Sequence, residues 1–139
     1  MTRTGIGYDS HRFAAPGPLV LGGVTIESDV RLAGHSDGDA VAHAVTDAIL
    51  GAAGLGDIGQ LFPDTDPANR NRDSIEMLRV AVARVCDAGW VVQQADVVVV
   101  TESPRIGPHR EAMQARVADA LSVNQADVSI KGKSNEGMG

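Results

Sequence analysis

The sequence has 139 residues, of which 43% are hydrophobic and 22% charged, and its formal net charge is −6. This length and composition predict one compact, soluble domain. Wholly apolar runs are only a few residues long, such as residues 97–100, whereas a membrane helix needs about 20. The opening residues resemble neither a signal peptide nor a transit peptide, so we expect a cytoplasmic protein without a membrane span. The acidic balance disfavours nucleic acid as a partner, since nucleic-acid binding normally needs a basic surface.

The composition of the core favours an oligomer. Aromatic residues make up only 3% of the chain, so Val, Ala, Leu and Ile must fill most of the interior. At about 25 cal/mol per Å² of buried apolar surface, such small side chains stabilise a small domain only modestly, and a core shared between subunits would add to this. The single cysteine, Cys86, lies among apolar residues and is expected to be a buried, inert thiol.

The first half of the chain predicts strands followed by one long helix. An extended strand is expected at residues 2–8, and Leu19–Leu21 and Val24–Ile26 should form a hairpin around two glycines. Apolar residues then recur at helical spacing over residues 38–53, and Gly54 is well placed to end that helix.

The second half predicts helices that alternate with strands. A helix should begin at Asp73, with Glu76 completing a capping box, and run to Gly89. A buried strand is expected at residues 90–101, a third helix should open at Pro108, and a last strand should cover residues 128–130. This alternation predicts a single α/β (α+β) domain in which a β-sheet packs against helices.

Three side chains suggest a metal site. Asp9 and His11 are two residues apart, so in an extended chain they leave the same face. With His43 they form a set of one carboxylate and two imidazoles, which would leave a coordination position open for substrate or water. Taken alone, an Asp-x-His pair is more often a turn carboxylate beside a surface histidine than a pair of metal ligands.

The long predicted helix also bears a polar stripe. Asp39, His43 and Asp47 are four residues apart and fall opposite the apolar face, which by itself indicates a solvated helix surface. The cluster at residues 35–39 just upstream favours a functional role, because it places His35, Ser36 and two acids at a helix N-terminus, where anions such as phosphate are stabilised.

Two loops each allow two interpretations from the sequence. The stretch at residues 56–67, rich in acids, Gly and Pro, could line a site or simply connect two helices. Residues 131–137 mix cations, small donors and one carboxylate after a strand, which suits a phosphate-contacting loop with a ligand for a hard cation, although a solvated tail fits the composition equally well.

Five segments produce a resemblance that covers essentially the whole chain. In order they read GIGYDSHRF, LGGV, HSDGDAVAHAVTDAILGAAGLGDIGQLFPDTDP, ESPRIGPH and KGKSNEG. Their order and spacing resemble the 2-C-methyl-D-erythritol 2,4-cyclodiphosphate synthase family of the non-mevalonate isoprenoid pathway. The resemblance implies a homotrimer whose sheets face the three-fold axis, with active sites between neighbouring chains. It also implies a metal-dependent lyase that cyclises 4-diphosphocytidyl-2-C-methyl-D-erythritol 2-phosphate and releases CMP.

The resemblance also implies a role for individual residues. Asp9, His11 and His43 match zinc ligands, and Glu136 matches a ligand of a second divalent ion, Mg²⁺ or Mn²⁺. His35 and Ser134 match catalytic residues that stabilise the transition state. The residues just named, apart from His43, also match substrate contacts. The further matches to substrate contacts are Ser10, Ser36, Asp47, Asp57, Ile58, Gly59, Phe62, Pro63, Asp64, Thr65, Asp66, Thr101, Glu102, Ser103, Pro104, Arg105, Ile106, Gly107, Lys133 and Asn135.

The chain departs from that family in two places. Lys133-Ser134-Asn135 stands where many members have a run of threonines, so a cation replaces a hydroxyl. Family members also continue beyond the position of Gly139 with a further strand, so residues 1–139 are expected to form a single synthase domain without that strand.

Two other functions are compatible with parts of the pattern. A two-His, one-carboxylate set is also the iron site of non-haem oxygenases, although those commonly have all-β scaffolds. A non-catalytic module that binds cytidine nucleotides would share the nucleotide pocket but release no CMP from the diphosphocytidyl substrate.

Overall fold

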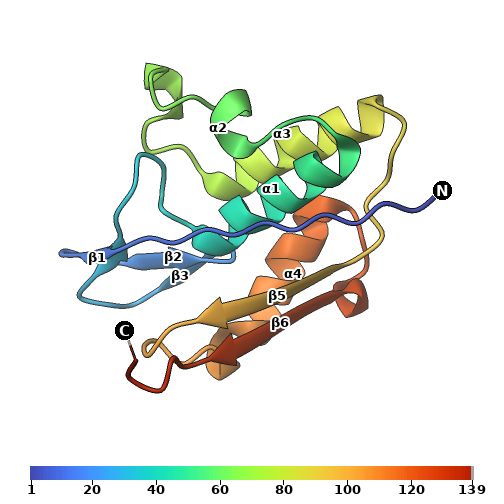
Figure 1. The fold of residues 1–139 in the computed structure, drawn as a ribbon. Helices are drawn as coiled ribbons and strands as arrows, with labels where there is room; N and C mark the ends of the chain where they lie inside the picture. The colour runs from blue at the N-terminus through green and yellow to red at the C-terminus, as the bar shows by residue number, and fades with distance from the viewer. Residues whose placement is uncertain (139) are drawn as a thin grey trace.

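A two-stranded parallel sheet organises the second half of the molecule. The computed structural model describes residues 1–138, and β5 (Ala95–Val100) pairs with β6 (Val128–Lys133) along six residues of each strand. Parallel strands need a crossover connection, which here is supplied by α4 (Arg110–Leu121), a helix packed against β6 (Figure 1). The α/β class predicted from the sequence is therefore confirmed.

Two long helices form the centre of the domain. Helix α1 (Ala40–Ala53) packs against α3 (Ser74–Asp87), and α3 packs in turn against α4. Gly54 ends α1 in the left-handed conformation, as its position predicted, because glycine adopts a positive φ without steric penalty. Asp73 caps α3 as expected, accepting a hydrogen bond from Ile75 N–H.

Short antiparallel pairs form the remaining sheets. The predicted hairpin is present, with β2 (Leu19–Leu21) paired to β3 (Val24–Ile26), and β1 (Phe13–Ala14) pairs with β4 (Arg31–Leu32). The shorter helical elements are α2 (Ile58–Leu61) and the 3₁₀ turns η1 (Pro67–Asn69), η2 (Gly107–His109) and η3 (Gln125–Asp127).

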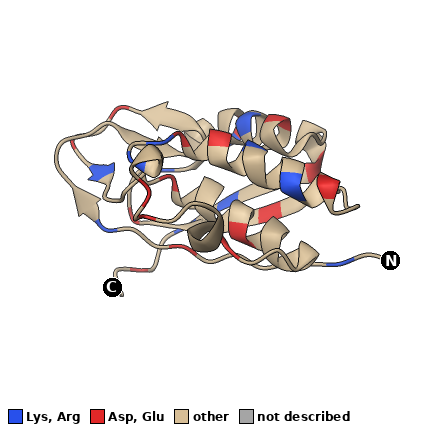
Figure 2. Ribbon diagram, turned by 90° about the horizontal axis from the view of Figure 1, so that it is seen from above, with Lys and Arg blue, Asp and Glu red and all other residues tan. Residues whose placement is uncertain are grey.

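The hydrophobic core joins these elements into one unit. Buried side chains from the hairpin, from α1, α3 and α4 and from β6 form one continuous cluster, with Leu19, Leu78 and Met113 almost completely enclosed. Among the described residues, no helix is long and apolar enough to cross a membrane. Charges of both signs are interspersed over the ribbon rather than gathered on one side (Figure 2).

The structure corrects several element boundaries. The strand predicted at residues 90–101 is ordered as β5 only over its second half, and the last strand extends three residues beyond the predicted 128–130. The third helix opens with the 3₁₀ turn η2, which contains Pro108, and α4 begins only at Arg110.

Two predictions about α3 are wrong. Glu76 does not complete a capping box but accepts a hydrogen bond from Arg72 at 3.0 Å. Cys86 is exposed rather than buried, because it follows Val85, the last buried residue of α3, and points away from the face that packs on α1 and α4.

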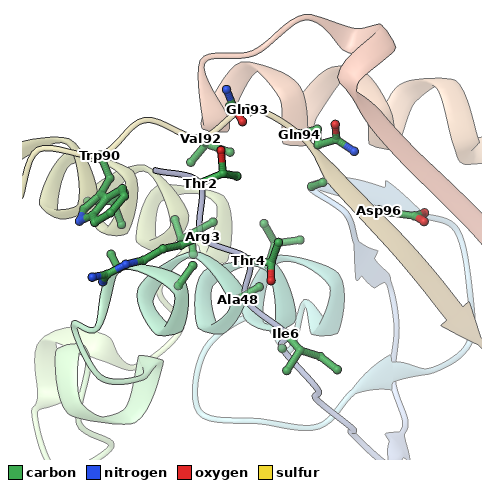
Figure 3. A pocket seen from close by; sticks show the side chains of 18 of the residues that line it. Thr2, Arg3, Thr4, Ile6, Ala48, Trp90, Val92, Gln93, Gln94 and Asp96 are labelled. Atoms are coloured by element: carbon green, nitrogen blue, oxygen red, sulfur yellow. The ribbon is translucent and has the colours of Figure 1, made fainter.

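The predicted first strand pairs with no other strand of the described residues. Residues 2–8 run alongside α1 (Figure 1), so closely that a Cβ on Gly5 or Gly7 would lie about 2 Å or less from a helix carbonyl oxygen. Between this segment and β5 lies a groove of about 950 Å³, with Ala48 of α1 among its lining residues (Figure 3). The backbone of this segment lies against α1 rather than beside a strand, so among residues 1–138 it joins no sheet.

Candidate metal centre and substrate site

Asp9, His11 and His43 converge, as the sequence predicted. One ligand atom from each lies within 4.8 Å of the others. Asp9 Oδ2 is 2.7 Å from His11 Nε2 and 3.2 Å from His43 Nδ1, and the two ring nitrogens are 3.3 Å apart. The first two residues precede β1 and the third lies in the second turn of α1, so tertiary packing assembles the set.

The hydrogen-bonding pattern of His11 fits a cation at this point. Its Nδ1 lies 2.6 Å from the carbonyl oxygen of Ala33, which can only accept, so the Nδ1 proton is committed there. In the neutral ring Nε2 is then a lone pair, and it faces the Asp9 carboxylate, another acceptor. Two acceptors at 2.7 Å need a shared cation between them, either a proton or a metal ion.

Electrostatics support the same conclusion. Partial burial alone would raise the pKa of Asp9, but hydrogen bonds and Coulomb attraction from His11 and His43 outweigh it and hold the pKa well below its ordinary value. The hydrogen bond to Asp9 raises the pKa of His11 despite the opposing effect of burial. The charged form of the Asp9 carboxyl is therefore favoured, which suits the binding of a cation.

Asp39 does not lie on a solvated helix face. It is fully buried, and its carboxylate accepts hydrogen bonds from the N–H groups of Gly22, Gly23 and Ala42 at 2.7–3.0 Å. Burial raises its pKa, although these three hydrogen bonds act in the opposite direction. The prediction of a solvated polar stripe is wrong for Asp39, because the hairpin turn covers the N-terminus of α1.

A cleft lies at the predicted phosphate cluster, and its lining does not include the three candidate ligands. It has a volume of about 520 Å³, and His35, Ser36, Arg31 and Arg70 are among its lining residues. Ser36, which lines the cleft, also contacts His43: its Oγ is 3.0 Å from Nε2, the ring nitrogen on the side away from Asp9 and His11. Within residues 1–138, His35 Nε2 is the one buried side-chain polar atom that lacks a hydrogen-bond partner. A buried nitrogen without a partner suits contact with a ligand.

The predicted loop at residues 56–67 is partly structural. Asp57 caps α2 in a capping box with Gln60, and Asp47 accepts a hydrogen bond from Ile58 N–H at 2.7 Å, which fastens α2 to α1. Phe62 is buried beneath the guanidinium of Arg72. Further along, Pro63 O accepts from an asparagine and Asp66 caps η1, and Gly59, Asp64 and Thr65 are among the exposed positions of the loop.

The predicted nucleotide loop and the predicted phosphate loop lie side by side. Glu102 accepts hydrogen bonds from the N–H groups of Asn135 and Gly137, and Thr101 N–H donates to Lys133 O. No hydrogen bond described for residues 1–138 joins the loop at residues 101–107 to the three candidate ligands. Lys133, Ser134 and Glu136 are exposed, as are Ser10 and most of residues 101–107 apart from Ile106, which is buried.

Comparisons with known proteins identify the family. The model of the YgbB family matches residues 2–139. The chain belongs to the YgbB family. It is 60% identical to a 2-C-methyl-D-erythritol 2,4-cyclodiphosphate synthase of Gemmatimonas aurantiaca, over 100% of this chain and 84% of the relative.

Solved structures of YgbB-type proteins share the fold. A 2C-methyl-D-erythritol-2,4-cyclodiphosphate synthase described as a CDP-bound form superimposes with a TM-score of 0.92 at 44% identity, covering 98% of this chain and 91% of the other. The bifunctional IspDF of Campylobacter jejuni gives a TM-score of 0.94 at 42% identity, with 99% of this chain matched to 37% of that larger protein. YgbB membership sets aside the oxygenase reading of the His/His/Asp set.

Proposed function

We propose that this YgbB-family chain performs the reaction named for its relatives. It cyclises 4-diphosphocytidyl-2-C-methyl-D-erythritol 2-phosphate to 2-C-methyl-D-erythritol 2,4-cyclodiphosphate and releases CMP, as a phosphorus–oxygen lyase of the non-mevalonate pathway. The observation that supports this most strongly is the convergence of Asp9, His11 and His43 in a fold shared with a CDP-bound synthase.

The reaction needs no protein nucleophile. An oxygen of the substrate's 2-phosphate attacks the outer phosphorus of the diphosphate, and the bond from that phosphorus to the oxygen of CMP breaks. A Zn²⁺ held by Asp9, His11 and His43 would polarise a phosphate oxygen as a Lewis acid. The chain must therefore hold a folded substrate and offset charge on its phosphates.

We assign the residues around the cleft to those tasks. His35 contributes its unpartnered Nε2 to a phosphate, Ser36 lies beside it on the cleft wall, and Ser134 donates to the developing charge. Arg31 and Arg70 add positive charge to the cleft walls. The loop at residues 57–66 contacts the methylerythritol, Asp47 lies toward the ribose, and residues 101–107 receive the cytosine.

A homotrimer would complete this site. The loop at residues 101–107 and the segment at residues 133–136 lie together but without a hydrogen bond to the metal ligands of the same chain in the described residues, so a neighbouring subunit could supply them. The outer face of the sheet exposes Val98 and Val100, with 54% and 58% of their surfaces accessible. Packing these valines about a three-fold axis would bury apolar surface and support the trimer.

The groove beside β5 suits one more strand. We propose that it receives the strand that family members carry after the segment matching residues 131–137. The free edge of β5 and the unpaired residues 2–8 flank the groove. The hydrogen bonds from Asn135 and Gly137 to Glu102 bring the chain across the end of β5 toward that edge (Figure 1).

We also propose a cytoplasmic location, since the exposed thiol of Cys86 suits a reducing compartment.

A direct assay tests the proposed activity. Purified protein with Zn²⁺ and Mg²⁺ is incubated with the diphosphocytidyl substrate, and CMP and the cyclic diphosphate are quantified by chromatography and ³¹P NMR. We expect equal amounts of the two products. Tight CDP binding without CMP release would instead indicate a non-catalytic nucleotide-binding module.

A second metal site is proposed at Glu136, whose exposed carboxylate would bind Mg²⁺ or Mn²⁺ at the diphosphate. We expect Glu136→Gln to lower Mg²⁺-dependent turnover by at least about tenfold, a loss of roughly 1.4 kcal/mol of transition-state stabilisation, while zinc content stays unchanged. Turnover over a Mg²⁺ titration and zinc content by mass spectrometry measure the two effects separately. Equal loss of zinc and turnover would argue against separate sites.

A further inference from the structure

A buried serine contacts the metal centre from the outside. Ser74, the first residue of α3, is fully buried, and its Oγ is 2.7 Å from Nε2 of His43. That nitrogen is on the opposite side of the imidazole from Nδ1, the atom that faces Asp9 and His11. Ser74 therefore lies where it can fix the orientation of the ring without touching a bound metal or substrate.

Asp37, the second partner of Ser74, determines the direction of these hydrogen bonds. The Ser74 hydroxyl also makes a short hydrogen bond to Asp37 Oδ1, and Ser74 N–H donates to Asp37 Oδ2 at 3.0 Å. A carboxylate only accepts, so the single hydroxyl proton of Ser74 is committed to Asp37. Toward His43 the same oxygen can then only accept, which places the proton of the neutral imidazole on Nε2.

We propose that Asp37 and Ser74 are positioning residues that hold His43 in its Nε2–H tautomer and aim the Nδ1 lone pair at the metal. The inference rests on the proposed metal centre but not on the identity of the substrate. A metal-bound histidine generally needs such an outer partner to fix its tautomer and ring orientation, and losing that partner typically weakens metal binding about 10- to 100-fold.

Two variants break the row of hydrogen bonds from Asp37 through Ser74 to His43 at different points. Ser74→Ala removes the nearer of the two hydroxyl oxygens at His43 Nε2 and leaves only Ser36 Oγ, at 3.0 Å, which keeps its own proton and can donate as well as accept. Asp37→Ala leaves the Ser74 hydroxyl in place but frees its proton to turn toward the ring. A matched control is Asp73→Ala, which removes the α3 N-cap one residue away without touching His43. All three changes disturb the start of α3, so only an effect specific to His43 separates the first two from the third.

The test has two readouts, neither of which requires turnover. Zinc affinity is measured by competition with a chromophoric chelator, and the tautomer of His43 is read from ¹⁵N chemical shifts of the zinc-free protein in alkaline buffer. We expect the Nε2–H form in the wild type and in Asp73→Ala, a mixture in both other variants, and zinc binding about 10- to 100-fold weaker only in those two.

Three results would overturn the proposal: an Nδ1–H tautomer in the wild type, unchanged tautomer and affinity in Asp37→Ala, or an equal loss of affinity in Asp73→Ala. If Ser74→Ala failed to fold, Asp37→Ala would decide the question alone. A wild-type protein that bound no zinc would refute the proposed metal centre, whereas its tautomer in the zinc-free state would still test the role of Asp37 and Ser74.

Discussion

Replacing His43 by alanine should abolish bound zinc and lower turnover by at least roughly 10³-fold, while the protein stays folded. The imidazole supplies one of three converging ligand atoms, and a bound metal that polarises a phosphate oxygen typically contributes several kcal/mol to transition-state stabilisation. The His43 side chain is part-buried rather than in the core. Its loss leaves the hydroxyl groups of Ser36 and Ser74 without their imidazole partner, which should cost only about 1–3 kcal/mol of folding free energy.

Zinc stoichiometry and turnover measured on the same preparation check this expectation. The matched control is His109→Ala, because His109 stands at the start of α4 without a side-chain capping bond. That variant should keep both zinc and activity. Full zinc content in His43→Ala would contradict the assigned ligand set, whatever its activity.

Asp39→Ala should be the most destabilising single change outside the apolar core. The substitution removes the N-cap of α1, worth about 1 kcal/mol. It also leaves the N–H groups of Gly22 and Gly23 without their acceptor, and each unsatisfied buried donor costs about 1–3 kcal/mol. We therefore expect the free energy of unfolding to fall by at least about 3 kcal/mol, measured by urea denaturation.

Asp73→Ala provides the comparison for that measurement. Asp73 caps α3 through Ile75 N–H but no other hydrogen bond to its side chain is described in residues 1–138, so its replacement should cost only about 1 kcal/mol. Equal losses in the two variants would show that the contacts of Asp39 to the hairpin turn contribute nothing measurable.

Local sequence signals predicted the elements that local chemistry determines. Gly54 at the end of α1 and the paired glycines of the β2–β3 hairpin are recognisable because positive φ angles favour glycine. The ligand set Asp9, His11 and His43 was predictable because metal coordination restricts residue type. Sequence reasoning was wrong about Asp39, which looks like part of a polar stripe until the hairpin is seen to cover it.

The outer contacts of the site could not be predicted from spacing. Ser74 lies 31 residues from His43 and reads as an ordinary helix start, and Asp37 reads as one of several acids in a loop. Arg31 and Arg70 reach the same cleft from separate elements. The contact between Ser74 and His43 depends on the packing of α1 against α3, which no local sequence pattern reveals.

The unpaired edge of β5 has a consequence for handling the protein. A row of backbone donors and acceptors without partners is a template for another chain, and here it borders a groove with a partly apolar lining. Molecules in which no strand occupies the groove would pair with one another at this edge at high concentration. Their aggregation during purification should therefore begin at β5 rather than at the helical side, and short β-forming peptides that cap the edge should slow it.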